Sequence, residues 1–216
     1  MFEGFPKDLP DFLWGLALNN ERSWFEAHRE QYERCLLKPF KALSFEIADR
    51  VEERWPGKAP ALHIARIHRD ARRLHGRGPY KDHLWFSLGH SGQLYDPSPK
   101  FWFEIGPASC GYGLGYFMAN AETMARWRAS IDANPAKISR IVRKINKDGR
   151  FHPYGEAYKR PKGDPGELLF DWYNRKHLGV ETEVFFEPDP PGPELVEELM
   201  DAMELLMPLY DYYEHI

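Results

Sequence analysis

Residues 61–83 hold the densest group of side chains in this sequence that could bind or transfer charge. Six Lys and Arg residues lie there with two Asp, a local charge of +4, and four of the nine histidines fall in the same segment. Guanidinium groups bind phosphate and carboxylate oxygens through paired hydrogen bonds, so the segment predicts a pocket for an anionic small ligand, such as a phosphorylated one. The charged residues are Arg66, Arg69, Arg72, Arg73, Arg77, Lys81, Asp70 and Asp82, and the histidines are His63, His68, His75 and His83.

Each residue of this pocket would have a defined part. Asp70 can orient Arg66 or Arg72 through bidentate hydrogen bonds, leaving the other guanidinium edges for the ligand. The same charges also fit an internal salt-bridge network that holds the loop and binds nothing. The sequence leaves both alternatives open. In the pocket, positive charge would come from Arg66, Arg69, Arg72 and Lys81, and the rim from Tyr80, Asn20 and Trp24.

A second hypothesis makes the chain a phosphoester-cleaving enzyme. Either Asp70 or His68 would then act as the general base. Nucleophilic catalysis has less support, because the sequence has no Gly-x-Ser-x-Gly turn. Neither Cys35 nor Cys110 lies in a basic turn that would lower the pKa of its thiol.

A resident metal is not expected from the histidine pattern. His63 and His68 are five positions apart and would lie on opposite faces of a strand, and no His-Glu-x-x-His helix occurs. The one geometric alternative is a pair of His68 and Asp70 helped by His83 or His90.

Three alternating glycines, Gly111, Gly113 and Gly115, would strip one face of a strand of its side chains. A backbone, a ring or a ligand could then approach that face closely. Close packing of a helix or an aromatic ring is the alternative to a ligand. The spacing matches neither a dinucleotide-binding fingerprint nor a phosphate-binding P-loop, so no cofactor is expected.

The charge of the whole chain hides an uneven distribution. The net charge of -4 excludes a polycation of the histone type. Residues 177–216 contain eleven acids and no Lys or Arg, which leaves +7 on residues 1–176. The acidic tail is either a solvated helix face or a surface that docks on the basic segment of its own chain or of a neighbour.

Two partner classes follow from this distribution. In a third hypothesis the chain is an interaction module whose acidic C-terminal helix engages a basic protein. For nucleic acid, the basic loop with Tyr80 and Trp85 suits a single strand or a nucleotide better than duplex DNA. No helix-turn-helix, RNP or KH signature accompanies it.

The sequence predicts a cytoplasmic protein that does not enter a membrane. No apolar run approaches the roughly 18–20 residues that span a bilayer, and residues 1–8 lack the layout of a signal peptide. Cys35 and Cys110 are too far apart for a CxxC or zinc motif, which favours reduced thiols.

Hydrophobic periodicity predicts helices at both ends of the chain and strands between them. We expect one α+β domain over residues 1–216, with an antiparallel sheet packed by N-terminal and C-terminal helices. Asp8 should cap the first helix, Asn19 and Asn20 should end it and offer an N-cap for the next, and Pro208 should kink the last helix or end it early. Helices are expected at 9–16, 24–39, 40–55, 120–131, 135–145, 168–173 and from 193, and strands at 62–70, 84–88, 100–105, 111–118 and, at an edge, 178–186.

Four separated motifs make the chain recognisable over nearly its whole length. It resembles a widespread bacterial family of conserved hypothetical proteins, a domain of unknown function. The resemblance adds weight to Asn20, Trp24, Arg66, Arg69, Asp70, Arg72, Tyr80 and Lys81 as one group. The motifs are Asn19-Asn20-Glu21-Arg22-Ser23-Trp24-Phe25 followed by Tyr32, Arg66-Ile67-His68-Arg69-Asp70-Ala71-Arg72 followed by Pro79-Tyr80-Lys81, Gly111-Tyr112-Gly113-Leu114-Gly115 leading to Tyr116-Phe117-Met118, and Tyr158-Lys159-Arg160-Pro161-Lys162-Gly163.

The chain departs from that family's pattern in two places. After Arg72 the family tends to have an aromatic residue and a turn rich in Lys and Asp, where this chain has Arg73-Leu74-His75-Gly76. The region after Gly163 also differs. The resemblance therefore implies no ligand preference for these loops.

Overall fold

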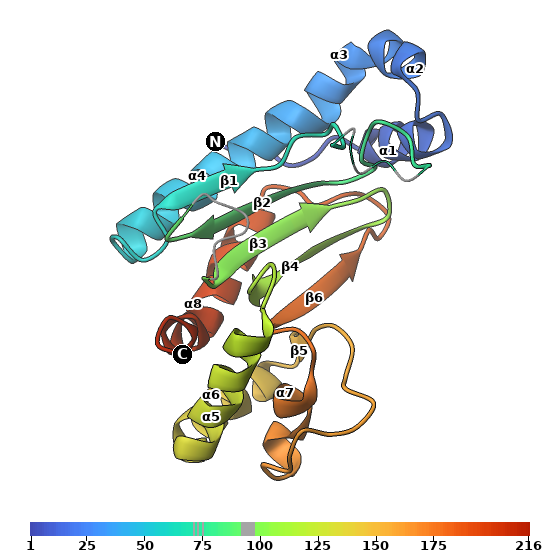
Figure 1. Cartoon of the computed structure of the whole chain (residues 1–216). Coiled ribbons are helices and arrows are strands. Elements are labelled where there is room, and N and C mark those ends of the chain that lie inside the picture. Colours follow the sequence, from blue (N-terminus) through green and yellow to red (C-terminus); the bar gives the residue numbers. More distant parts are fainter. Residues whose placement is uncertain (71, 73, 75, 92–97) are drawn as a thin grey trace.

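The computed structural model describes residues 1–70, 72, 74, 76–91 and 98–216 (Figure 1). Within these residues the chain forms a six-stranded antiparallel sheet with the strand order β1-β2-β3-β4-β6-β5. The sheet and the helices on either side of it in the sequence confirm the predicted α+β class. The strands are β1 (Ala61–Ile64), β2 (Leu84–Gly89), β3 (Lys100–Ile105), β4 (Ser109–Gly115), β5 (His152–Pro153) and β6 (Gly179–Phe185).

Helices from the two ends of the chain cover the same face of the sheet. Figure 1 shows α4 and α8 behind it, where α4 contacts β1 and β2 and α8 contacts β4. The helices are α1 (Leu9–Leu18), α2 (Arg22–Ala27), α3 (Arg29–Gln31), the π-helical turn η1 (Tyr32–Leu37), α4 (Lys38–Arg54), α5 (Ala121–Ala133), α6 (Pro135–Asp148), the 3-10 turn η3 (Glu167–Leu169), α7 (Phe170–Asn174) and α8 (Leu195–Tyr213).

The core lies between these helices and the alternating apolar side chains of the central strands. Phe86 and Phe103 face each other across β2 and β3, with ring centroids 5.6 Å apart. From α4, Phe40 meets Phe86 edge-on, and from α8, Tyr210 stacks on Phe101 at 5.1 Å. Burying each such side chain contributes about 1.5–3 kcal/mol. The opposite face of these strands carries the half-buried residues Trp85, Trp102 and Glu104.

The first and last strands differ from the predictions. The predicted strand 62–70 is only partly formed, because β1 ends at Ile64 and residues 67–69 pair with residues 79–81. The N–H of Arg69 donates to the Pro79 carbonyl, and that of Lys81 donates to the Ile67 carbonyl. The predicted edge strand, β6, lies one strand inside the sheet, since the short β5 pairs with its first half.

The predicted helix caps near the N-terminus are wrong for two residues. Asp8 directly precedes α1, but its carboxylate contacts Arg34 instead of capping the first turn. Asn20 does not cap α2, whose N-terminal flanking residue is Glu21. In both cases a tertiary partner takes the side chain that local sequence would assign to the helix end.

The last helix does not end at Pro208. It continues to Tyr213, although proline has no N–H to donate. Pro208 is exposed, whereas Leu209, Tyr210 and Tyr213 after it are almost completely buried. Burial of these side chains holds the final turn in place.

The acidic tail pairs with cations of its own chain, but not with those that the sequence suggests. Among the described residues, the Lys and Arg partners of α8 lie along and just after α4 and not in the basic segment 61–83. Carboxylates of α8 pair with Arg50, Arg54 and Lys58, the last through Asp211 at 2.6 Å. Among the residues that the structure describes, no helix is long and apolar enough to cross a membrane.

Candidate functional site

Asn20 holds the predicted basic loop against the N-terminal helices. Its Nδ2 donates to the Tyr80 carbonyl and its Oδ1 accepts from the Tyr80 N–H, both at 2.9 Å. The loop approaches closely because Gly78 has no side chain: a Cβ there would lie 2.2 Å from Asn20 Oδ1. The structure thus gives Asn20 the role of a clamp on the backbone of Tyr80.

Arg69 and Lys81 are also engaged with the backbone of this loop. Nε of Arg69 donates to the Tyr80 carbonyl at 2.7 Å, and its Nη2 lies 3.6 Å from Asp82 Oδ1. Nζ of Lys81 donates to the Arg66 carbonyl at 2.6 Å. Burial, followed by the nearby Arg69 guanidinium, lowers the pKa of Lys81. Both cations therefore contribute to holding the loop.

Asp70 orients Arg72, one of the two arginines that the sequence assigns to it. Nε and Nη2 of Arg72 donate to the two carboxylate oxygens at 3.0 and 2.8 Å. The Arg72 side chain is 88% exposed. Arg66 and His68 are exposed too, while Arg73 and His75 lie outside the described residues.

The two aromatic residues expected at the rim pack against other rings. Tyr80 is 3% exposed and stacks on Phe25 at 4.1 Å. Trp24 is half-buried and stacks on His28 at 3.9 Å. The structure brings Asn20, Arg69, Tyr80 and Lys81 into one set of contacts, and their binding of a ligand stays a prediction.

Replacing Asn20 by alanine should lower the free energy of unfolding by about 1–3 kcal/mol, because the Tyr80 N–H would lose its acceptor in a part-buried site. Asn19→Ala is the matched control, since that side chain is exposed and donates to the Gly15 carbonyl of the helix that it ends. Urea unfolding measures both. Equal effects of the two substitutions would contradict the clamp.

The face of the sheet opposite α4 and α8 is hollowed by two adjoining cavities of about 230 and 410 Å³. They share Trp102, Glu104 and Glu181, and together we call them the glycine groove. Other lining residues are Trp85, Ser87, Lys100, Gly115, Tyr116, Phe117 and Tyr154 in the smaller cavity, and Asp82, His83, Gly106, Pro107, Ser109, Gly111, His152, Thr182 and Glu183 in the larger one.

Gly111 and Gly115 of β4 line this groove, and the glycines of the strand allow two kinds of close approach. A Cβ on Gly113 would lie 2.0 Å from the Val180 carbonyl oxygen of β6. On Gly115, a Cβ would lie 2.9 Å from the ring of Tyr154, and on Gly111 it would lie 3.6 Å from Trp102. Backbone and aromatic packing, the expected alternative to a ligand, therefore accounts for part of the motif.

Aromatic rings form the walls. Trp85 stacks with Phe117 at 6.1 Å and an interplanar angle of 19°, and His63 packs on Trp85 at 5.2 Å. The OH of Tyr154 donates to the Tyr116 carbonyl at 2.7 Å, which fixes its ring beside Gly115. The groove therefore presents flat apolar surface to whatever enters it.

Carboxylates dominate the charge of the groove. Glu104 and Glu181 line both cavities, and Asp82 and Glu183 line the larger one. Burial, with a smaller contribution from Glu183, raises the pKa of Glu181 despite His152 at 3.8 Å. In the described lining, Lys100 is the one Lys or Arg, and its Nζ donates to Ser91 and Ser98.

The groove and the basic loop meet at Asp82. This carboxylate lies 3.6 Å from Arg69 of the loop and 3.0 Å from Nδ1 of His83, whose Nε2 lies 4.0 Å from Glu104. Burial works to raise the pKa of Asp82, but the hydrogen bond with His83 and the Arg69 charge outweigh it and lower that pKa. A chain of polar contacts thus runs from the loop into the groove.

One family model matches residues 8–212, and its description is a conserved hypothetical protein, DUF2461. The chain belongs to the DUF2461 family. No curated protein matches it. In this DUF2461 chain the first motif contains the Asn20 clamp, and the second lies in the basic loop. The third motif, 111–118, contributes Gly111, Gly115, Tyr116 and Phe117 to the lining of the glycine groove.

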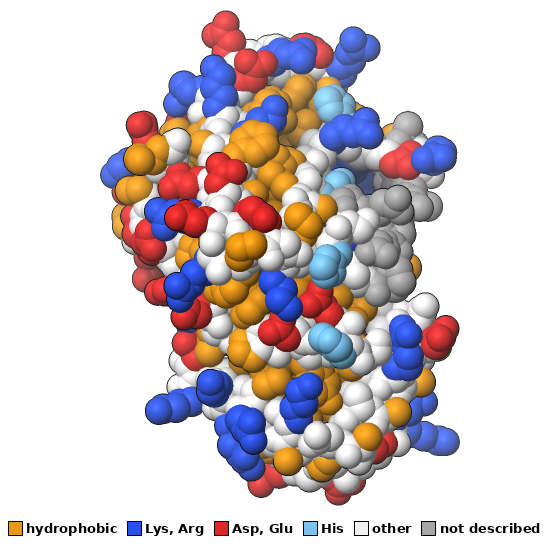
Figure 2. Space-filling model, turned by 90° about the vertical axis from the view of Figure 1, so that its left-hand side faces the viewer, with side chains coloured by type: hydrophobic (Ala, Val, Ile, Leu, Met, Phe, Trp, Pro, Cys, Tyr) orange, Lys and Arg blue, Asp and Glu red, His pale blue; other side chains and the backbone are white. Residues whose placement is uncertain are grey.

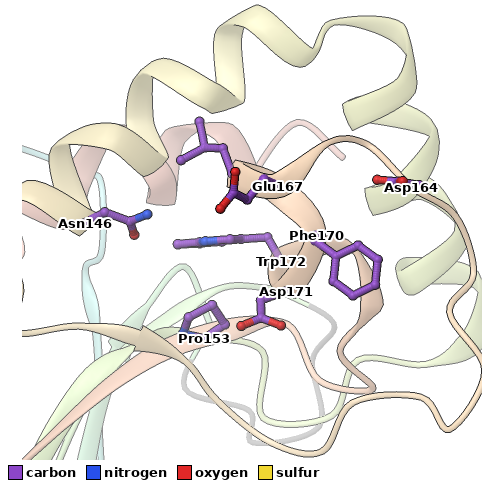
Figure 3. A pocket seen from close by; sticks show the side chains of 8 residues that line it. Asn146, Pro153, Asp164, Glu167, Phe170, Asp171 and Trp172 are labelled. Atoms are coloured by element: carbon purple, nitrogen blue, oxygen red, sulfur yellow. The ribbon is translucent and has the colours of Figure 1, made fainter.

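A larger depression, of about 850 Å³, lies between the end of α6, η3 and β5. In Figure 3 the ring of Trp172 lies across it, with Glu167 on one side and Pro153 and Asp171 on the other. Trp172 is only 5% exposed, so little of its ring is available to a ligand. The glycine groove offers more aromatic surface and is the better candidate site.

Sequence reasoning missed Trp102, Glu104, Glu181 and Tyr154. The alternation Lys100, Trp102, Glu104 in β3 was the available signal, because those three side chains share the face opposite the apolar core. Residues from β6 and from the chain beside β5 come to this face only through tertiary pairing.

Cys35 and Cys110 are free and buried, and burial raises the pKa of each thiol to about 12. Neither is therefore activated as a nucleophile. Within the described residues, no three His, Cys, Asp or Glu side chains converge as metal ligands would.

Proposed function

We propose that this chain binds a small organic cation, an amine attached to a ring or apolar body, in the glycine groove. The observation that carries the proposal is the composition of the smaller cavity, where Trp85, Trp102, Phe117 and Tyr154 surround a space bordered by Glu104 and Glu181. Aromatic faces attract cations, and a carboxylate beside them supplies the counter-charge.

The charge balance of the groove favours a cation over an anion. Four carboxylates line its two cavities, and the ammonium of Lys100, 4% exposed as a residue, is already held by Ser91 and Ser98. An anion would face Glu104 and Glu181 with no compensating hydrogen bond from them. A cation would replace the solvation that these carboxylates lose by burial.

Two probes with one ring and opposite charges test this proposal. Tryptamine should bind with a Kd about tenfold lower than indole-3-acetate, because the ammonium gains an ion pair and cation–π contacts. The pKa of Glu181 is raised, so tryptamine affinity should also increase as the pH rises through that pKa, because Glu181 then becomes charged. Isothermal titration calorimetry at several pH values measures both effects.

Variants separate the contributions of ring and charge. Trp102→Ala should weaken both probes, whereas Glu181→Gln should remove the preference for tryptamine and leave indole-3-acetate unchanged or tighter. Glu122→Gln, in the exposed first turn of α5, is the control and should change neither Kd. Equal or tighter binding of indole-3-acetate by the unmodified chain would overturn the proposal.

The predicted anion pocket is the second candidate, favoured by one observation. Burial lowers the pKa of Lys81, and the Arg69 and Arg66 charges lower it further, which indicates that three cations of the loop lie near one another. Asp70 accepts hydrogen bonds from Arg72 with both oxygens, which suits an orienting role better than that of a general base.

For this loop, inorganic phosphate should raise the melting temperature of the unmodified chain by more than that of the Arg66→Gln, Arg72→Gln double variant. Lys38→Gln with Lys41→Gln, two exposed positions of α4, serves as the control. Differential scanning fluorimetry at constant ionic strength measures the shift. The absence of any rise at tens of millimolar phosphate would exclude the loop as an anion site. An equal rise in the loop variant and in the α4 control variant would exclude it too.

The other two hypotheses have less support. An interaction module would use α8, but its apolar side, from Leu195 to Tyr213, is built into the core. Binding of a single-stranded nucleic acid would bring phosphates to the acidic groove beside the loop. The free, buried thiols of Cys35 and Cys110 support our proposal that the chain works in the reducing cytoplasm.

A further inference from the structure

The outer face of α6 is basic. This helix carries Lys137, Arg140, Arg143, Lys144 and Lys147, and none of the five has an ion pair among the residues that the structure describes. Figure 2 shows Lys and Arg side chains gathered toward the lower end of the molecule, where Figure 1 places α5 and α6. In the upper part, basic and acidic side chains are intermixed. The opposite side of α6 buries Ile138, Val142 and Ile145.

Three of these cations face a cavity. It has a volume of about 450 Å³ and lies between α6 and the end of α8. Lys137, Arg140 and Lys144 follow one another at three and four positions, so they share one side of the helix. Across the cavity lie Pro208, Asp211, Tyr212 and His215, and Ile141 completes its lining. We call this cavity the α6–α8 cleft.

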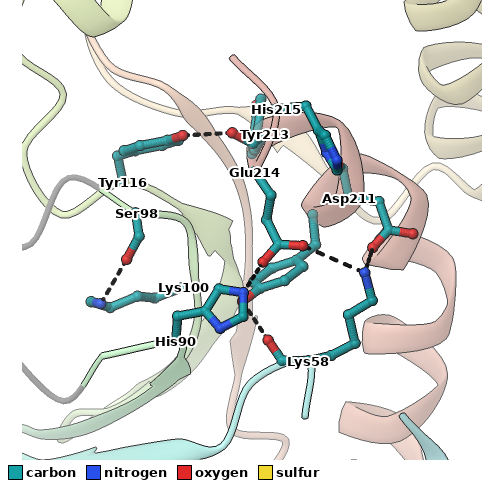
Figure 4. Close-up of polar contacts among 10 residues, drawn as sticks. Lys58, His90, Ser98, Lys100, Tyr116, Asp211, Tyr213, Glu214 and His215 are labelled. Carbon is teal, nitrogen blue, oxygen red and sulfur yellow. Dashed lines mark hydrogen bonds and ion pairs between the residues drawn. The ribbon is translucent and has the colours of Figure 1, made fainter. Parts of the chain in front are cut away.

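The carboxylate in the cleft is already engaged. Asp211 is the one acid in the described lining, and its Oδ1 accepts from Lys58 at 2.6 Å on the side of α8 toward α4. In Figure 4 the Asp211 side chain turns to Lys58, which also pairs with Glu214. Asp211 therefore forms its ion pair with Lys58 and does not act as the counter-ion of Lys137, Arg140 or Lys144.

Two further contacts prepare the cleft for an anion. Nζ of Lys137 lies 5.2 Å from the ring centroid of Tyr212, a cation–π contact that restrains the long side chain at the cavity. Nδ1 of His215 lies 2.6 Å from the Asp211 carbonyl oxygen and donates to it. This bond orients the imidazole of His215 at the margin of the cleft.

We propose that the α6–α8 cleft is a binding site for a soluble, phosphate-bearing small molecule. Three neighbouring cations repel one another, and a phosphate group with a charge of about -1.5 to -2 relieves that repulsion better than a singly charged carboxylate. Arg140 offers paired N–H donors, and the two lysines add compact charges beside it. The cleft shares no described lining residue with the glycine groove, so this site is independent of the proposed amine site.

Titration with inorganic phosphate tests the proposal, with acetate at the same ionic strength as the comparison. In two-dimensional NMR spectra, phosphate should shift the amide signals of α6 and of residues 208–215, and acetate should not. The Arg140→Gln, Lys144→Gln double variant should weaken phosphate binding at least tenfold. Arg143→Gln with Lys147→Gln removes two charges from the same helix outside the cleft, and should change the Kd less than twofold.

Three results would overturn the proposal. Equal weakening by the two double variants would show general attraction to a basic helix. Phosphate-dependent shifts confined to residues 66–81 would place the anion at the loop. Co-sedimentation with phosphatidylglycerol vesicles without binding of free phosphate would make the cleft a membrane contact and exclude a soluble ligand.

Discussion

Replacing Gly113 by alanine is expected to destabilise the fold by about 3 kcal/mol. The new Cβ would lie 2.0 Å from the Val180 carbonyl oxygen and 3.0 Å from the Glu181 Cα, both backbone atoms of β6. Because backbone cannot rotate aside as a side chain can, β6 would have to shift and lose part of its pairing with β4. Guanidinium unfolding followed by circular dichroism measures the change.

Gly106→Ala is the matched control for this prediction. Its nearest neighbour would be the Ser109 carbonyl oxygen at 3.7 Å, an ordinary contact, so stability should change by less than about 1 kcal/mol. The shift of β6 also moves Glu181, so any Gly113→Ala protein that remains folded should lose the preference for tryptamine. A stability of Gly113→Ala equal to that of Gly106→Ala would show that β6 does not pack on this glycine.

Above pH 10 the protein should unfold cooperatively, with a midpoint near pH 11. Burial raises the pKa of Cys35, Cys110, Tyr32 and Tyr154 to about 12. It also raises the pKa of Tyr112, Tyr210 and Tyr213. A raised pKa means that the folded state holds the proton more tightly than the unfolded state does. The contribution of such a group to folding stability is fully present below its pKa in the unfolded state. This contribution is lost as the pH rises toward its pKa in the folded state.

The size of this effect decides the outcome. Each group opposes folding by about 1.4 kcal/mol for every pH unit above its unfolded pKa. At pH 11 the two thiols and five phenols together reach on the order of 10 kcal/mol, comparable with the whole stability of a typical domain. The loss should therefore be abrupt and should involve several protons.

Circular dichroism at 222 nm and tyrosinate absorbance at 295 nm, recorded together against pH in the presence of a reductant, measure this transition. The two signals should change at the same pH. Tyr112→Phe should release one proton fewer, because its phenol, which donates to Glu198 at 2.5 Å, would be gone. Gradual tyrosinate formation centred at pH 10 with unchanged dichroism would contradict the prediction.

Local sequence was sufficient for most of the secondary structure. Lys100–Ile105 is a strand with the predicted bounds, and Asn120 caps α5 by accepting from the Thr123 N–H at 2.8 Å. These elements depend on alternation and on a side chain three residues away, both visible in a short window. The errors at Asp8 and Asn20 and the continuation of α8 past Pro208 share one cause, since each of these residues or its neighbours has a tertiary contact that outweighs the local preference.

The candidate sites were much less predictable. Arg66 and Arg69 follow β1 and do not lie in the predicted strand, and the structure engages Arg69 with Tyr80 and Asp82, and Arg72 with Asp70. Whether a charged side chain is available to a ligand depends on the carbonyls and carboxylates that folding brings beside it. Positions in a sequence do not specify those neighbours.

By itself, the sequence determined the α+β class, the family, the glycine strand and the charge contrast between the acidic tail and the rest of the chain. Only the tertiary structure decided where the charges act. It placed the acids of α8 on Arg50, Arg54 and Lys58, left the cations of α6 facing a cleft, and put Glu181 of β6 beside Trp102 of β3. The physical reason is the sequence separation of the residues involved. Hydrophobic periodicity depends on residues within one helix or strand, whereas a binding site is made by side chains that come together from different elements.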